Sequence, residues 1–177
     1  MLINIKEAYT DRVPLKQIVL AHKLRPTNPV KVINEELYKE VKMALKGCLA
    51  YDGIGIAANQ IGINKSFFLI REDEENFRVY FNPKLKISNN PSLIEKEGCL
   101  SVPGYRLLVE RPIEIIVDWQ EIQNNEFVLM ENRIFKDNDA RVFLHELDHL
   151  KGVSIIDKSC ELNRAGKRDI LKQLSQR

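Results

Sequence analysis

Two histidines lie four residues apart in the segment HELDH at residues 145–149. On a helix, residues i and i+4 lie one turn apart on the same face, so His145 and His149 can hold one metal ion between them. Glu146 lies beside them, where its carboxylate can reach a water molecule on the metal without taking a coordination position. The chain has only three histidines, and two of them occupy this motif. The spacing therefore predicts a catalytic metal site and disfavours two incidental surface histidines.

A catalytic metal of this kind needs a third protein ligand and an open coordination position. Cys99 is the favoured candidate, because it lies in the glycine-bearing segment EGCLS at residues 97–101, next to a predicted turn. From the spacing alone, a buried structural thiol explains Cys99 about as well. Cys160 lies in a plain connecting segment, and His22 has no ligand-type spacing around it. Glu161 is the alternative third ligand, as in a zinc endopeptidase that uses the same helix.

The third segment of interest is the glycine-rich stretch GIGIAANQ at residues 53–60. Its glycines match a relaxed dinucleotide-binding pattern, but a predicted helix precedes them where a nucleotide-binding fold needs a strand. On residue types alone, an ordinary turn that ends a helix is the favoured interpretation. The alternative is a backbone that comes close to a substrate, with Gln60 offering an amide donor.

Composition is that of an ordinary globular protein. The chain has 177 residues, of which 44% are hydrophobic and 29% charged, and these values predict one domain over residues 1–177. A formal net charge of +2 is too small to indicate a nucleic-acid or membrane partner. No apolar run is long enough to cross a bilayer, and the first residues lack the features of a signal or transit peptide. Three cysteines do not suggest a disulfide framework, so we expect a cytoplasmic protein.

Three helices are expected to frame the chemical motifs. The first is capped by Asn34 and ends at Gly53 in a left-handed conformation. The second begins near residues 137–139 and stops at Gly152, and the third begins at Asn163. Residues 14–32 contain three prolines and are expected to be irregular. The apolar stripes expected to face the core are Leu37, Val41, Ala44, Leu45 and Cys48 on the first helix, Phe143, Leu147 and Leu150 on the second, and Ile170, Leu171 and Leu174 on the third.

Short β-type runs alternate with turn signals between residues 66 and 133. This hairpin-like spacing predicts antiparallel pairing and an α+β fold class. The runs are residues 67–70, 79–81, 107–109, 113–117 and 127–129, and the expected turns are at 82–83, 89–91, 103–104, 111–112 and 124–125.

Taken together, the three motifs resemble, in the same order, the signatures of the peptide deformylase family: Gly-x-Gly-x-Ala-Ala-x-Gln, Glu-Gly-Cys-Leu-Ser and His-Glu-x-Asp-His. The likeness extends over residues 34–158, and three motifs in order are more specific than any one of them. It implies a hydrolase that removes the formyl group from the N-terminal methionine of new polypeptides and releases formate. The expected fold is a single α+β domain with antiparallel β-sheets packed around a central metal-binding helix and with a C-terminal helix.

The resemblance also implies a role for each residue of the metal motif. Cys99, His145 and His149 would bind one divalent metal ion, ferrous iron in most of the family, with zinc, nickel or cobalt as alternatives. Glu146 would act as general base and then as general acid.

Further roles follow for the oxyanion and for the peptide. The resemblance implies that Gln60 and the backbone of Leu100 form the oxyanion site. An extended peptide would add main-chain hydrogen bonds, as in strand addition, and an apolar pocket would select methionine. The residues expected to contact the peptide are Ile54, Gly55, Gly98, Arg106 and Val142.

The sequence departs from the family pattern at two positions and leaves rival functions open. Asn59 stands where the family often has proline, and Leu144 where it often has glutamine. Glu97 and Arg111 match a pair that would brace the cysteine loop. The rivals are a zinc endopeptidase with Glu161 as third ligand and a catalytically silent module that binds nascent chains. The expected partner is an N-formylmethionyl peptide, and a ribosome contact through the basic C-terminal helix is left open.

Overall fold

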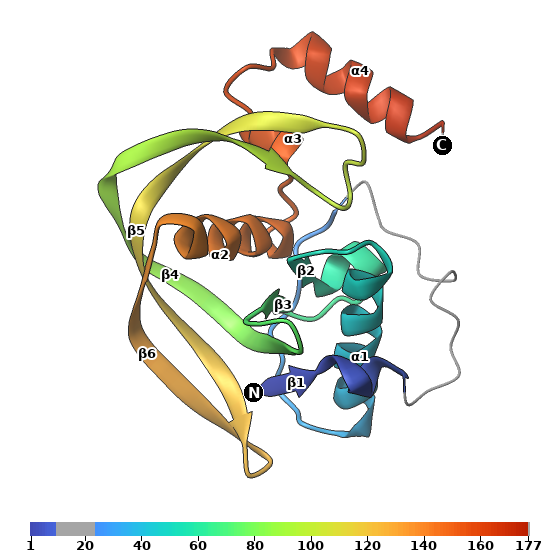
Figure 1. The fold of residues 1–177 in the computed structure, drawn as a ribbon, viewed down its shortest axis with the longest axis vertical. Coiled ribbons are helices and arrows are strands. Elements are labelled where there is room, and N and C mark those ends of the chain that lie inside the picture. Colours follow the sequence, from blue (N-terminus) through green and yellow to red (C-terminus); the bar gives the residue numbers. More distant parts are fainter. Residues whose placement is uncertain (10–23, 177) are drawn as a thin grey trace.

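A computed structural model describes residues 1–9 and 24–176 and is drawn in Figure 1. Residues 14–23 of the expected irregular segment, His22 among them, lie outside the described residues. No described helix is both long and apolar enough to cross a membrane. In chain order the elements are β1 (Leu2–Asn4), the 3₁₀ helix η1 (Ile5–Tyr9), α1 (Glu35–Ala50), β2 (Gly55–Ala57), the 3₁₀ helix η3 (Ala58–Ile61), β3 (Phe67–Arg71), β4 (Asn76–Gly98), β5 (Arg106–Gln123), β6 (Glu126–Lys136), α2 (Asp137–Leu150), α3 (Ile155–Lys158) and α4 (Arg164–Leu174).

The six strands form one antiparallel sheet in the order β2-β3-β4-β5-β6, and β1 pairs with the start of β4 on the edge opposite β3. Figure 1 shows the long strands β4 and β5 bending around α2, which is enclosed by the sheet. The predicted fold class and the central position of the second helix are therefore confirmed. One continuous, bent sheet stands where several sheets were expected.

Three of the expected turns are wrong. Residues 82–83 and 89–91 lie inside β4, and residues 111–112 lie inside β5. The register between β4 and β5 shifts at Phe81/Lys84 and again at Asn89/Ser92, so the proline-containing segments of β4 are β-bulges. A bulge tolerates proline, which cannot donate a ladder hydrogen bond. The turn at residues 124–125 is confirmed: both asparagines have positive φ, as a two-residue hairpin requires.

Helix α1 forms where the capping residue and the apolar stripe predict it. The Asn34 side chain accepts the N–H of Leu37 at 2.9 Å, and the whole predicted stripe is buried. The left-handed residue after the helix is Asp52, with φ of 51°, so the expectation for Gly53 is wrong by one residue. A Cβ on Gly53 would lie 2.8 Å from Cys48 Sγ, which means that close packing requires the glycine there.

Strand β3 separates two hydrophobic clusters because its side chains alternate between the two faces of the sheet. Phe67 packs in the cluster that contains the buried stripe of α1. Phe68 faces the opposite side and packs edge-on against Phe143 of α2, with ring centroids 5.1 Å apart. Phe143, Leu147 and Leu150 are all buried, as predicted, and this packing fixes the rotation of α2 about its axis.

The helices α3 and α4 pack against the N-terminal part of β5. Ile170 and Leu174 of α4 are buried in a third cluster with Val109 of β5 and the unpredicted helix α3. Leu171, which was expected on the same side, is 40% exposed, so its assignment to the core is wrong. Asn163 caps α4 by accepting the N–H of Gly166 at 3.0 Å.

Candidate active site

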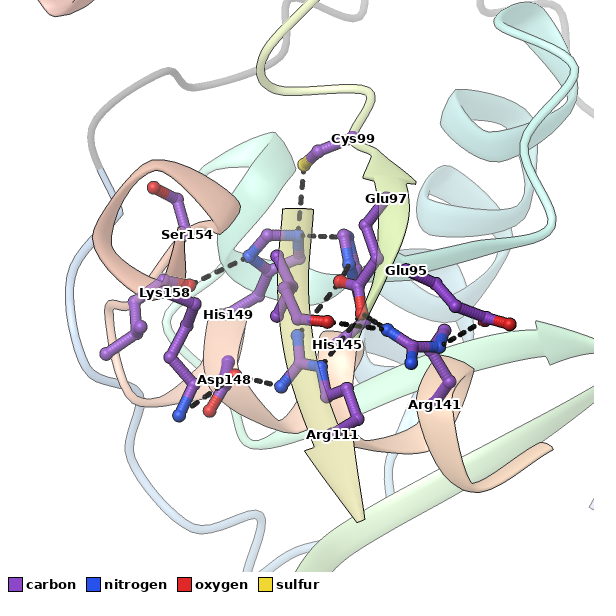
Figure 2. Close-up of polar contacts among 12 residues, drawn as sticks. Glu95, Glu97, Cys99, Arg111, Arg141, His145, Asp148, His149, Ser154 and Lys158 are labelled. Carbon is purple, nitrogen blue, oxygen red and sulfur yellow. Dashed lines mark hydrogen bonds and ion pairs between the residues drawn. The ribbon is translucent and has the colours of Figure 1, made fainter. Parts of the chain in front are cut away.

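The metal-ligand candidates from two distant parts of the chain converge beside α2 (Figure 2). Cys99 Sγ lies 3.2 Å from His149 Nε2, and this nitrogen lies 3.0 Å from His145 Nε2. One ligand atom from each residue lies within 4.8 Å of the others. Among the described residues this is the one group of three or more His, Cys, Asp and Glu side chains with such spacing. The structure thus brings together the three residues that the sequence analysis favoured.

The donor atoms fit one divalent ion. With metal–nitrogen bonds of about 2.0–2.1 Å, two imidazole nitrogens of a tetrahedral set lie about 3.4 Å apart, which is near the spacing of the three donors here. A thiolate and two imidazoles suit zinc, iron, nickel or cobalt and are poor ligands for magnesium or calcium. Three protein ligands also leave a coordination position for water or substrate.

Both histidines are oriented by acceptors on their other ring nitrogen. His145 Nδ1 lies 3.0 Å from Glu97 Oε2, and His149 Nδ1 lies 3.0 Å from the Val153 carbonyl oxygen. An acceptor at Nδ1 fixes the tautomer in which Nε2 carries a free lone pair. The surroundings therefore prepare both imidazoles to bind a metal through Nε2.

Glu97 is the centre of a buried ion network (Figure 2). Arg111 donates from Nε and Nη2 to its two carboxylate oxygens at 2.9 and 3.0 Å. Arg141 donates from Nη1 to Glu97 Oε1 at 2.8 Å. Burial would raise the pKa of Glu97, but hydrogen bonds from His145 and Arg111 outweigh it and lower that pKa to about 2. The expected Glu97–Arg111 pair is present. Arg141 and the Asp148 carboxylate, which also binds Arg111, were missed.

Glu146 is buried next to the backbone of β2. Its Oε2 atom has no hydrogen-bond partner in the structure. Burial, opposed in part by nearby His145 and Arg111, raises the pKa of the Glu146 carboxyl to about 7. A Cβ on Gly55 would lie 2.6 Å from Glu146 Oε1, so the second glycine of the GIGIAANQ segment makes room for this carboxylate. A buried carboxylate oxygen without a partner can accept a hydrogen bond or a proton from a bound molecule.

Gln60 is also buried, and its amide is held from both ends. Its Oε1 accepts the N–H of Ala57 at 2.8 Å, and its Nε2 donates to Ser101 Oγ at 3.1 Å and lies 3.9 Å from Cys99 Sγ. The amide is therefore fixed with its donor end toward the cysteine loop. The favoured interpretation of residues 53–60 as a plain turn is wrong, since Gly55–Ala57 is strand β2 and residues 58–61 form η3.

Both departures from the family motifs have a structural explanation. Asn59 donates from Nδ2 to the carbonyl oxygen of Arg25 at 2.9 Å and to that of His149 at the end of α2. Leu144 is 7% exposed and packs with Phe143 in the cluster beneath α2. Asn59 therefore ties the glycine-rich segment to the metal-binding helix, and Leu144 adds to the core.

A cavity of about 430 Å³ opens in front of the three ligand candidates. Gln60, Cys99, Leu100, His145 and Glu146 all line it, whereas His149 is buried behind them. The wall formed by α2 carries Asn138 and Arg141 beside Val142, so the expected apolar pocket is only partly apolar. The residues expected to contact a peptide all line the cavity: Ile54, Gly55, Gly98, Arg106 and Val142.

Comparison with known proteins identifies the family. The family model described as polypeptide deformylase matches residues 15–165. The chain belongs to the polypeptide deformylase family. A peptide deformylase of Synechocystis sp. is 31% identical over 162 residues, which cover 88% of this chain and 84% of the relative.

Solved deformylase structures share the fold. The Synechococcus elongatus peptide deformylase in complex with actinonin is 30% identical, with a TM-score of 0.75 over 90% of this chain and 88% of that one. A class I type b peptide deformylase from Acinetobacter baumannii with Met-Ala-Ser bound is 28% identical, with a TM-score of 0.68 over 80% of this chain and 97% of that one. Membership of this family implies a catalytic metal, and Cys99, His145 and His149 form a group that could hold it.

The endopeptidase alternative does not fit this deformylase fold. Glu161 is exposed, and its Oε1 accepts the N–H of Leu108 at 3.0 Å, away from the cluster of ligand candidates. The thermolysin-like ligand set that Glu161 would complete is therefore not assembled among the described residues.

Proposed function

We propose that this chain is a peptide deformylase that hydrolyses the formyl group from N-formylmethionyl peptides and releases formate. One observation carries the proposal: a buried carboxylate with an unpartnered oxygen, Glu146 Oε2, lies in a cavity beside the Cys99–His145–His149 cluster. The related deformylases, one of them with Met-Ala-Ser bound, support this substrate class.

Cys99, His145 and His149 would hold the metal ion. A bound divalent ion in such a site polarises a carbonyl oxygen and lowers the pKa of a water molecule. We propose ferrous iron, with zinc, nickel and cobalt as alternatives, because a thiolate and two imidazoles bind all four. The resemblance to the deformylase family favours iron within this group.

Glu146 would move the proton. Its carboxylate takes a proton from the attacking water, whose oxygen forms the new bond to the formyl carbon. The carbon–nitrogen bond then breaks as Glu146 returns the proton to the departing amine, so that formate and a free N-terminus result. A pKa raised to about 7 by burial suits a group that must accept and release one proton near neutral pH.

Gln60 and Leu100 would stabilise the charge that develops on the formyl oxygen. The Gln60 amide is held in place by Ala57 and Ser101, so its donor needs no reorganisation during the reaction. The Leu100 N–H has no acceptor among the described residues, and this residue lines the cavity. We infer that both donors act on the formyl oxygen of the substrate.

The substrate peptide would lie along exposed strand edges. Within the described part of the chain, β2 is an edge strand of the sheet, and β4 pairs only with β5 over residues 92–98. Both edges border the cavity through Gly55 and Gly98. Main-chain hydrogen bonds to these edges would recognise any extended peptide, while the cavity receives the first side chain.

Formate release from a formyl-Met-Ala-Ala peptide tests the proposal against the rival functions. We expect release with anaerobically purified protein whose iron content is measured in the same sample. Cys99→Ala should lose the metal and the activity, whereas Glu161→Ala should keep both. Full metal occupancy in Cys99→Ala, with loss in Glu161→Ala, would support the endopeptidase. Metal binding without formate release would support the silent module.

The cellular setting is a further part of the proposal. We propose a cytoplasmic location, where nascent polypeptides are made. The ribosome remains a candidate partner, since α4 carries Arg164, Lys167, Arg168 and Lys172, and a basic surface suits RNA phosphates.

A further inference from the structure

Residues 95–98 at the end of β4 lie beside the cavity, and their positions alternate between the two faces of the strand. Glu95 and Glu97 point toward α2, where both bind Arg141. Lys96 and Gly98 therefore point the opposite way, because successive side chains of a strand lie on opposite faces. In the β4–β5 register, Gly98 pairs with Arg106, which places Arg106 on the same face as Lys96.

Lys96 and Arg106 are the two cations that this face contributes to the cavity lining, and Glu110, which pairs with Ile94 on the same face, is exposed outside the cavity. Both side chains are exposed and line the cavity, and neither side chain has an ion-pair or hydrogen-bond partner among the described residues. The other charges of the cavity wall behave differently, since Glu97 and Arg141 neutralise each other within the buried network. Asp52, on the α1–β2 side, is one further exposed charge of the lining. The part of this strand face that borders the cavity is thus positive.

A peptide bound as an added strand must follow the same alternation. If its first side chain enters the cavity toward α2, its second side chain points to the face of Lys96 and Arg106, and its third returns to the α2 side. We propose that Lys96 and Arg106 select formyl-methionyl peptides with an acidic second residue. This inference rests on the proposed deformylase function and names the substrate class within it.

The preference should appear in binding more than in the chemical step. The second side chain is remote from the reacting formyl group, so its attraction to two cations is similar in the ground state and in the transition state. Such uniform binding changes KM and leaves kcat nearly constant. Since both cations are exposed, salt should weaken the effect.

The experiment compares amidated peptides formyl-Met-X-Ala and formyl-Met-Ala-X, in which X is Glu, Gln or Lys. At low ionic strength we expect kcat/KM to fall in the order Glu, Gln, Lys at the second position, with about a fivefold step each, as two exposed charge pairs allow. The third position should show little preference. The Glu-to-Lys ratio at the second position should reverse in Lys96→Glu/Arg106→Glu, fall towards one in Lys96→Gln/Arg106→Gln, and stay unchanged in Lys84→Glu, an exposed lysine of β4 outside the cavity.

The outcomes separate this inference from the proposed function. Equal rates for Glu and Lys at the second position would overturn the inference, as would the same preference at the third position or a ratio unaffected by the double variants. If the wild type releases no formate from any peptide, the proposed function itself fails. The salt dependence of the wild-type ratio provides the same test should a charge-reversed variant fold poorly.

Discussion

Glu146 shows how much of the chemistry depends on a single side chain. It is 4% exposed and has one oxygen without a partner, yet none of the ligand candidates needs it to hold a metal. We therefore expect Glu146→Ala to keep its metal and to lose activity by a factor on the order of 10² to 10⁴, the usual contribution of a general acid–base group. Elemental analysis and formate release on the same preparation check both parts. Loss of metal in this variant would identify Glu146 as a ligand.

At the residue scale, the sequence could predict roles that depend on local spacing. The i, i+4 placement of His145 and His149 is such a case. Arg141 could not be found in this way, because its partners Glu97 and Val109 lie on strands far away in the chain. Asp52 was missed because its left-handed backbone depends on how the chain leaves α1, and residue type alone favoured the neighbouring glycine.

At the scale of elements, Arg141 connects α2 to two strands. It donates to Glu97, to the Leu93 carbonyl of β4 at 2.7 Å and to the Val109 carbonyl of β5 at 3.1 Å. We expect Arg141→Met to weaken metal binding by about 10- to 100-fold, as removal of partners behind metal ligands does, because Glu97 loses one of its two arginines.

Titration of the metal-free protein with cobalt measures this effect without relying on activity. Glu95→Gln is the matched control, since Glu95 contacts Arg141 through Nε, away from the Nη1 that holds Glu97, and is half exposed. Its cobalt affinity should stay close to that of the wild type. Equal losses of cobalt affinity in both variants would mean that Arg141 contributes to stability alone and does not orient His145 through Glu97.

The strands show where prediction from sequence stops at this scale. Pro83 and Pro112 are turn signals by composition, but each lies in a long strand near a register shift of the β4–β5 pair. Local sequence cannot distinguish a bulge from a turn, because the neighbouring strand decides whether pairing resumes. α1 and α2 were predictable because their caps and apolar stripes are local features.

At the scale of the whole molecule, the metal site lies beside two hydrophobic clusters that are complete without it. The clusters on the two faces of β3 bury the stripes of α1 and α2, and the metal-ligand candidates are not the residues that hold these helices to the sheet. Cys99 packs against the third cluster, which contains no buried residue of α1 or α2. The fold should therefore persist when the metal is removed.

Metal removal should lower the stability of the protein without unfolding it. Binding to the native state alone adds about 4 kcal/mol when the free metal exceeds its Kd a thousandfold. For a chain of 177 residues, each kcal/mol shifts Tm by about 2–4 °C, so a chelator should lower Tm by roughly 8–16 °C. Far-UV circular dichroism at 25 °C should stay native in the chelator, because the core clusters remain buried.

A cobalt series should raise Tm with the logarithm of the metal concentration, and Cys99→Ala should hardly respond, since it lacks one of three ligands. Unfolding of the wild type at 25 °C in the chelator would instead show that the metal holds α2 and the cysteine loop together. The bent sheet would then be unable to form around α2 before the metal binds.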